Sequence, residues 1–183
     1  MTANHTHAVQ PEFSRPLAVD HLGEAAVFRE ITATEEERAA LARRFGLLAL
    51  DRLSADLRIE RLPGKGVVRV SGRFEAAAAQ ACVISLEPVP SRISQEFSQL
   101  YTLAPEAPGA REHVIDPEAD DPPEAIGSGD LDLGEAVVQQ FALALDPYPR
   151  VPGAQPPAVP DEVAPPPEVA GPFAVLKALK GRK

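Results

Sequence analysis

Apolar and polar residues along the chain repeat with two different periods, and each period predicts a different kind of element. Between Leu47 and Leu103 the period is two, as where Ala55, Leu57 and Ile59 alternate with charged residues. The same alternation returns in two later stretches, which carry Val68, Val70, Gly72 and Phe74, and then Ile93, Phe97 and Tyr101. Because alternation is typical of half-buried strands, we expect antiparallel strands that form a meander or a partly open barrel.

Less regular stretches flank and join these strands. Phe13 to Val19 is predicted to be an extended first segment, and Leu62 to Gly66 is predicted to be a turn. Residues 76–85 are rich in small side chains, so both a strand and a bent edge remain open for them.

A first helix is predicted between Thr34 and Gly46. Thr34 and Glu37 have the spacing of a capping box, in which each residue satisfies a backbone N–H of the other. The helix turns Ala40, Leu41 and Phe45 inward and stops at Gly46.

A second helix is predicted from an apolar stripe that recurs every four residues. The stripe consists of Leu133, Val137, Phe141 and Leu145. Asp130 and Asp132 precede it, as suits a helix start, and Pro147 stops it near Asp146. Pro147, Tyr148 and Pro149 then run extended toward Arg150. Two interpretations stay open: a core helix with its exit turn, or a contact surface on a braced segment that loses little entropy on binding.

The C-terminal part is predicted to be a tether with an apolar hook. Half of the chain's 20 prolines lie between Asp146 and Pro172, which favours extended polyproline geometry. Pro172 suits the first turn of a short helix, whose apolar stripe is Phe173, Leu176 and Leu179. So short a helix is marginal alone, and docking on its own domain and docking in a partner's groove both remain open.

These segments predict an α+β protein with two main helices and a proline-rich tail that ends in a short helix. We expect a frayed N-terminus over 1–12 and a single domain over 13–150. An acidic loop over 104–129 interrupts that domain. The tether then occupies 151–170 and the short amphipathic helix 171–183.

Charge is distributed unevenly along the chain. The net charge is −9, and residues 102–170 alone hold 14 acidic and 2 basic side chains, whereas residues 171–183 hold 4 basic and no acidic ones. No basic stripe has the length expected of a nucleic-acid binder. Direct contact with RNA remains open, at one edge of the near-neutral half, and the acidic half would attract a basic protein partner.

Side chains that carry chemistry are sparse. Cys82 is the only cysteine, so it cannot form a disulfide within the chain, and we expect it to be a small buried side chain. The four histidines show no ligand spacing and are interpreted as surface residues; they are His5, His7, His21 and His113. No phosphate-binding loop and no nucleophile with a placed base is recognisable. We therefore expect no catalysis, metal, cofactor or small-molecule substrate, with a hydrolase built on Cys82 as the remaining enzymatic alternative.

Neither a signal peptide nor a membrane-spanning run is recognisable. We therefore expect a cytoplasmic protein that does not use a membrane as a partner.

Four segments, in this order, resemble the bacterial YceD family, which is named for large ribosomal RNA subunit accumulation. They are Val70-Ser-Gly-Arg-Phe74; Ala81-Cys-Val-Ile-Ser-Leu-Glu-Pro-Val89; Leu131-Asp-Leu-Gly-Glu135 with Ala144-Leu-Asp-Pro-Tyr-Pro-Arg150; and Pro172-Phe-Ala-Val-Leu-Lys177. The resemblance runs from about Ala33 to Lys180 and implies a role in 23S ribosomal RNA accumulation without a known reaction. Some members of the family carry a Cys-x-x-Cys pair where this chain has Cys82 and Ser85, so any metal role in relatives does not transfer.

The resemblance implies a non-enzymatic ribosome-assembly factor. Its partner would be a large-subunit ribosomal protein or a precursor particle. The alternative is a general acidic chaperone or adaptor unrelated to the ribosome. The candidate partner-binding residues are Asp132, Gly134, Glu135, Gln140, Asp146, Pro147, Tyr148, Pro149, Arg150, Pro172, Phe173 and Leu176.

Overall fold

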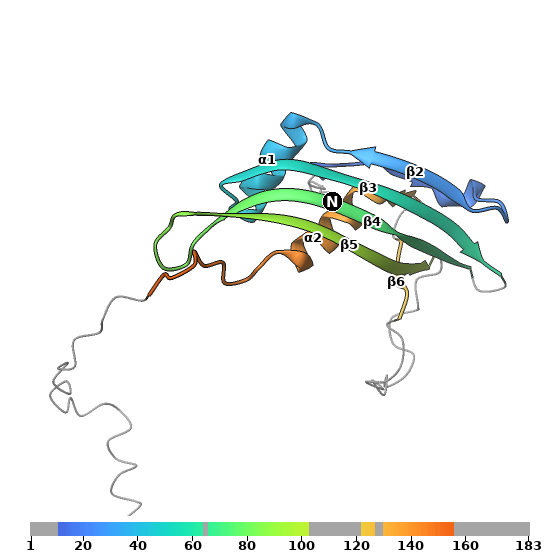
Figure 1. Cartoon of the computed structure of the whole chain (residues 1–183). Helices are drawn as coiled ribbons and strands as arrows, with labels where there is room; N and C mark the ends of the chain where they lie inside the picture. The colour runs from blue at the N-terminus through green and yellow to red at the C-terminus, as the bar shows by residue number, and fades with distance from the viewer. Residues whose placement is uncertain (1–10, 64–65, 103–121, 127–129, 156–183) are drawn as a thin grey trace, which may run out of the picture.

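The computed structural model describes residues 11–63, 66–102, 122–126 and 130–155, and its main feature is an open sheet with two helices on one face (Figure 1). The elements in chain order are β1 (Pro16–Ala18), the 3-10 helix η1 (Val19–His21), β2 (Val27–Thr32), α1 (Glu35–Phe45), β3 (Ala49–Leu62), β4 (Val67–Ala81), β5 (Pro88–Thr102), β6 (Glu124–Ala125), β7 (Asp130–Asp132) and α2 (Leu133–Ala144). Neither helix in these ranges is long and apolar enough to cross a membrane.

The five strands of the main sheet lie in the order β2-β3-β4-β5-β6. Neighbours from β2 to β5 are antiparallel, and β6 pairs with the end of β5 in parallel. The predicted α+β class and antiparallel meander are therefore confirmed. The sheet does not close, because β2 and β6 remain as its edges.

The predicted alternation places one set of side chains under the helices. Leu57, Gly72 and Phe97 lie opposite one another on three adjacent strands, and directly opposite residues share a face of a sheet. Ala55, Leu57, Ile59, Val68, Val70, Phe74 and Tyr101 are buried, and Ile93 and Phe97 pack against them. Residues 76–81 continue β4, which settles the first half of the stretch that was open between a strand and a bent edge.

Several short strands form without a prediction from the sequence. β1 pairs with β7 in a separate two-stranded ribbon, so Asp130–Asp132 is a strand and not simply the approach to a helix. Of the predicted acidic loop, residues 122–126 are described; they include β6, and Ile126 is buried. The rest of that loop, residues 1–10 and residues 156–183 lie outside the described ranges, as do the predicted tail helix and His5, His7 and His113.

The first helix has the predicted boundaries for the predicted reasons. The Thr34 hydroxyl accepts a hydrogen bond from the Glu37 N–H at 3.3 Å, and the Thr34 N–H donates to the Glu37 carboxylate at 2.8 Å. At its end, Gly46 has a φ of 64°, a left-handed conformation that glycine adopts without steric cost. Leu41 is fully buried, and Phe45 meets Phe141 of α2 edge to face at 5.8 Å.

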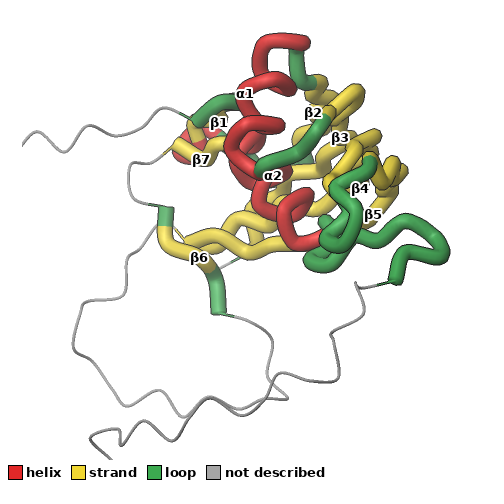
Figure 2. Tube along the Cα trace, turned by 90° about the vertical axis from the view of Figure 1, so that its left-hand side faces the viewer, coloured by secondary structure: helices red, strands yellow, loops and turns green. Residues whose placement is uncertain are grey.

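Figure 2 shows α1 and α2 together on one face of the sheet. The core lies between them and the strands, where Phe74 and Phe141 are completely buried. Phe13, in the predicted extended first segment, is also completely buried. The N-terminal segment thus belongs to the same core as the helices.

Asp132 fastens that N-terminal segment to the start of α2. It caps the helix by accepting hydrogen bonds from the N–H groups of Gly134 at 2.9 Å and Glu135 at 3.2 Å. The same carboxylate accepts from the Arg15 N–H at 2.8 Å and from the Ser14 hydroxyl at 2.5 Å. One side chain therefore satisfies donors from two segments that are far apart in the sequence.

Ion pairs on the surface connect α1 to its neighbours. Arg15 pairs with Glu37 at 2.7 Å, and Arg44 pairs with both Glu12 at 3.0 Å and Glu135 at 2.8 Å. Pairs that remain partly in contact with water contribute little stability one by one. Their main effect is to fix how α1 and α2 lie relative to the N-terminal segment.

Gly134→Ala tests the close packing at the start of α2. A Cβ atom there would lie 2.0 Å from the Phe13 carbonyl oxygen, and backbone cannot move aside as a flexible side chain can. We expect the free energy of unfolding in urea to fall by about 1–3 kcal/mol, because the clash outweighs the roughly 1 kcal/mol that alanine gains over glycine in a helix.

Gly23→Ala is the matched control, since a Cβ at Gly23 meets no atom within 4 Å. That variant should change the free energy of unfolding by less than about 0.5 kcal/mol. Equal stabilities of the two variants would contradict the packing at Gly134.

Candidate functional site

Most of the exposed apolar side chains lie on segments that meet at one end of the molecule. The large hydrophobic residues that the described ranges leave exposed are Phe28, Leu48, Val83, Leu86, Leu143 and Tyr148. Val83 and Leu86 lie in the connection between β4 and β5, Leu143 lies in the last turn of α2, and Tyr148 follows that helix. We call these four side chains the apolar end. Grouped exposed apolar side chains typically mark interaction sites, whereas single ones are ordinary.

The chain that leaves α2 is held against the β4–β5 connection. We call residues 146–151 the strap. The Gln80 amide donates to the Asp146 carbonyl at 2.8 Å, and the Val83 N–H donates to the Pro149 carbonyl at 2.9 Å. In Figure 1 the strap accordingly passes beside the turn between β4 and β5. The segment that was predicted to run extended instead bends at Pro147 and Tyr148, and these hydrogen bonds make it a fixed part of the fold.

The strap buries one of its proline side chains and leaves its tyrosine side chain exposed. Pro149 is buried, whereas Tyr148 is 71% exposed. The Asp146 carboxylate accepts the Tyr148 N–H at 2.9 Å, which is an Asx turn that fixes the backbone locally. Proline has a fixed φ, so Pro147 and Pro149 restrict the backbone on both sides of Tyr148. Little backbone entropy is left for Tyr148 to lose when it contacts another molecule.

Cys82 is at the centre of the junction between strap and connection. Its buried sulfur accepts hydrogen bonds from the N–H groups of Ser85 at 3.4 Å, Val151 at 3.4 Å and Ile84 at 3.5 Å. The burial predicted for Cys82 is confirmed, and the sulfur is also a hydrogen-bond acceptor that joins two segments. The Ser85 hydroxyl, then the N–H groups of Ser85 and Val151, lower the pKa of this thiol from 9.0 to about 6, while burial opposes them and the Ile84 N–H adds least.

Leu86 has the only positive φ among the non-glycine residues that the structure describes, at 63°. A left-handed conformation costs a residue with a Cβ roughly 1–2 kcal/mol. Leu86 is also 75% exposed, so its side chain gains little from burial in this fold. Backbone strain that coincides with an exposed apolar side chain is typical of contact sites.

The structure divides the predicted partner-binding residues into two groups. Asp132, Gly134 and Glu135 lie at the start of α2, where each has an internal contact described above. Asp146, Pro147, Tyr148 and Arg150 are exposed on the strap, Pro149 is buried in it, and Gln140 is half-buried on α2. The helix α2, about 18 Å long with 12 residues at 1.5 Å per residue, runs from the first group to the strap and carries Gln140 along its length. Partner binding by any of these residues stays a prediction.

Pro172, Phe173 and Leu176 lie outside the described residues. Val83, Leu86 and Leu143 were not among the predicted contact residues. For Leu143 a signal existed: at 100° per residue it lies about 200° around the helix from Phe141, opposite the buried stripe. For the two residues in the β4–β5 connection we find no signal in the sequence.

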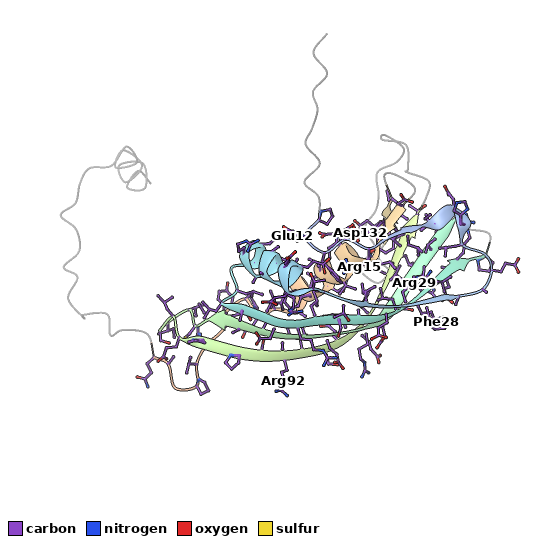
Figure 3. The ribbon with its side chains drawn as sticks, turned by 90° about the horizontal axis from the view of Figure 1, so that it is seen from above. Glu12, Arg15, Phe28, Arg29, Arg92 and Asp132 are labelled. Atoms are coloured by element: carbon purple, nitrogen blue, oxygen red, sulfur yellow. The ribbon has the colours of Figure 1, made fainter. Side chains whose placement is uncertain are left out.

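The sheet face away from the helices differs from the apolar end. Figure 3 shows Phe28 and Arg92 on this face, with Arg15 and Asp132 on the helix side. Its charges are mixed and largely paired: Arg52 with Glu75, Arg58 and Arg69 with Glu60, and Arg73 with Glu96. Among the described residues, no group of three or more His, Cys, Asp or Glu is placed to hold a metal ion.

Titration of Cys82 tests the junction beneath the strap. We expect the ultraviolet absorbance of the thiolate to rise with a midpoint near pH 6 in the folded protein and near 9.0 after unfolding. A thiol whose pKa is lowered by folding stabilises the fold above the unfolded pKa, and this stabilisation is lost as pH falls through the folded pKa. Unfolding measurements from pH 6 to 9 should therefore show stability rising with pH in the native protein, and less so in Cys82→Ala. A folded midpoint at or above 9.0 would contradict the hydrogen bonds to the sulfur.

Comparison with known proteins adds one finding to this geometry. No curated protein and no solved structure matches the chain. A family model described as "Large ribosomal RNA subunit accumulation protein YceD" matches residues 70–180. The match includes β5, α2 and the strap, together with most of β4. Since it covers more than half of the 183 residues, the chain belongs to the YceD family.

Proposed function

We propose that this protein is a non-enzymatic assembly factor for the large ribosomal subunit, which supports the accumulation of 23S ribosomal RNA. The observation that carries the proposal is the family match, whose description names large ribosomal RNA subunit accumulation. The function is exerted by binding a large-subunit ribosomal protein or a precursor particle.

The apolar end and the strap are the contact surface in this proposal. Tyr148 is exposed on a backbone that neighbouring hydrogen bonds already fix, so binding costs little ordering entropy. Tyrosine and arginine are also the residue types that most often dominate binding energy, and Arg150 is exposed two residues further along the strap. Asp146 and Pro147 complete the exposed part of the strap.

The charge distribution favours a basic protein over bare RNA as the direct partner. Residues 102–170 carry a net charge of −12, from 14 acidic and 2 basic side chains, and this part of the chain includes α2 and the strap. Such a region repels phosphate and attracts a basic protein. Four arginines of the open sheet face, Arg52, Arg58, Arg69 and Arg73, form ion pairs with glutamates, which reduces the positive charge that this face offers to RNA.

Depletion of the protein tests the proposal. We expect selective loss of 23S relative to 16S ribosomal RNA and a deficit of large subunits in sucrose gradients. An unchanged ratio of subunits would overturn the proposal. It would support the alternative of a general acidic chaperone or adaptor, a role for which the apolar end and the acidic charge would also be suited.

Tyr148→Ser tests the contact surface separately from the family assignment. Because Tyr148 is exposed, the variant should fold with native stability, yet it should bind the precursor particle at least about tenfold more weakly, as expected for an aromatic anchor. The measurement is the fraction of protein that co-sediments with the particle.

Phe28→Ser is the matched control, since Phe28 is 70% exposed and lies on β2, away from the strap. It should co-sediment like the native protein. If the Phe28 variant lost binding and the Tyr148 variant kept it, the contact surface would be misplaced even though the role in assembly stood.

A further inference from the structure

We propose that residues 172–180 dock onto the apolar end of their own chain when no partner is bound. The inference does not rest on the ribosomal role, since it concerns only how the chain covers its own apolar surface. Two observations support it: the exposure of the side chains at the apolar end, and the position of the last described residues next to the β4–β5 connection.

The docking surface consists of side chains that the fold holds in place but leaves exposed. Leu86 is 75% and Leu143 79% exposed, and Tyr148 is 71% exposed. The segments that carry them are joined through the Val83–Pro149 hydrogen bond at 2.9 Å and the Val151–Cys82 hydrogen bond at 3.4 Å. Leu48, also exposed, joins the same end through its N–H bond to the Ala79 carbonyl near the end of β4. Covering such side chains is favourable by about 25 cal/mol for each Å² of apolar area.

The described part of the chain that leads to the occupant ends close in sequence to this surface. The described chain ends at Gln155. This residue lies four positions after Val151, whose N–H donates a hydrogen bond to the Cys82 sulfur. Beyond it, Phe173, Leu176 and Leu179 recur at intervals of three in an otherwise small and basic stretch. The family match continues through the intervening prolines to residue 180. The apolar residues and the apolar end therefore fall within the same matched unit.

The connecting segment is long enough for docking within one chain. Residues 156–171 would span roughly 50 Å at about 3.1 Å per residue in polyproline geometry. For docking within one chain, this segment needs only to return to the end of the molecule that it leaves. A linker of this kind gives an effective concentration in the millimolar range. At such an effective concentration, the docked state is populated even when the apolar contact between the tail and the apolar end is weak.

Charge adds to the apolar attraction. Residues 171–183 carry four basic side chains, namely Lys177, Lys180, Arg182 and Lys183. Exposed carboxylates at the apolar end are Glu87 in the β4–β5 connection and Asp146 on the strap, with Arg150 as the opposing exposed cation. Two carboxylates against one cation leave a net negative rim that suits a basic tail. A partner that uses the apolar end must displace this tail.

Fluorescence can test this docking cleanly because the chain contains no tryptophan. In Phe173→Trp, the single indole should emit at short wavelength and be protected from iodide quenching. Adding Leu86→Ser and Leu143→Ser should shift the emission to that of water-exposed indole and remove the protection. Adding Phe28→Ser instead, as the control, should change neither. Circular dichroism of each variant checks that the fold is retained.

Three results would overturn the proposal. The first is an emission typical of water-exposed indole already in Phe173→Trp. The second is an emission that does not change when Leu86→Ser and Leu143→Ser are added. The third is a protected emission that is lost on dilution, which would indicate a second copy as the occupant. Because an indole could itself alter docking, a truncation after residue 170 provides an independent measurement. Deleting the tail should raise the binding of an apolar dye, and the rise should disappear in Leu86→Ser with Leu143→Ser.

Discussion

The hydrogen bonds between the strap and the β4–β5 connection determine what this molecule shows to a partner. The Val83 N–H and the Pro149 carbonyl form one link at 2.9 Å, and the Val151 N–H and the Cys82 sulfur form another at 3.4 Å. Between these links Pro149 is buried and Tyr148 is exposed. An aromatic side chain is thereby displayed on a backbone that is already ordered. Without these bonds the residues after α2 would not be held in one conformation. Binding through Tyr148 would then cost more backbone conformational entropy.

The asymmetry of the sheet explains why exposed apolar side chains lie on the segments at an end of the molecule. Both helices cover the same face (Figure 2), and the opposite face carries paired arginines and glutamates. Neither face therefore presents grouped apolar side chains. The turn between β4 and β5 and the end of α2 lie beyond the covered area, where Leu86 and Leu143 find no partner within the described chain.

How far the sequence predicts this structure depends on whether a feature is local. The capping box of Thr34 and Glu37 and the stripe of α2 involve residues three or four apart, and both were predicted correctly. The long strands were predicted because alternation persists over many residues. β6 and β7 have two and three residues, too few for a period to show, and they exist because a distant strand offers pairing.

The candidate site was predictable only in part for the same reason. Asp132 was recognised as a helix cap, but its bond to the Ser14 hydroxyl spans 118 residues and leaves no local trace. The two prolines predicted a restricted backbone around Tyr148 but not the bend that the structure has there, and the partners of the strap lie in the β4–β5 connection, far away in the sequence. The hydrophobicity of Leu86 alone predicts that its side chain is buried. The tertiary structure leaves it exposed instead.

The central claim is that the apolar end and its strap are the surface that binds the partner. Photo-crosslinking in cells tests it most directly, with a photoreactive phenylalanine derivative in place of Tyr148 and, in a second strain, in place of Arg92 on the open sheet face (Figure 3). We expect a crosslink from position 148 to a protein of the large-subunit precursor and none from position 92. Crosslinks to that precursor from position 92 alone, or no crosslink from position 148 in cells that are assembling ribosomes, would contradict it.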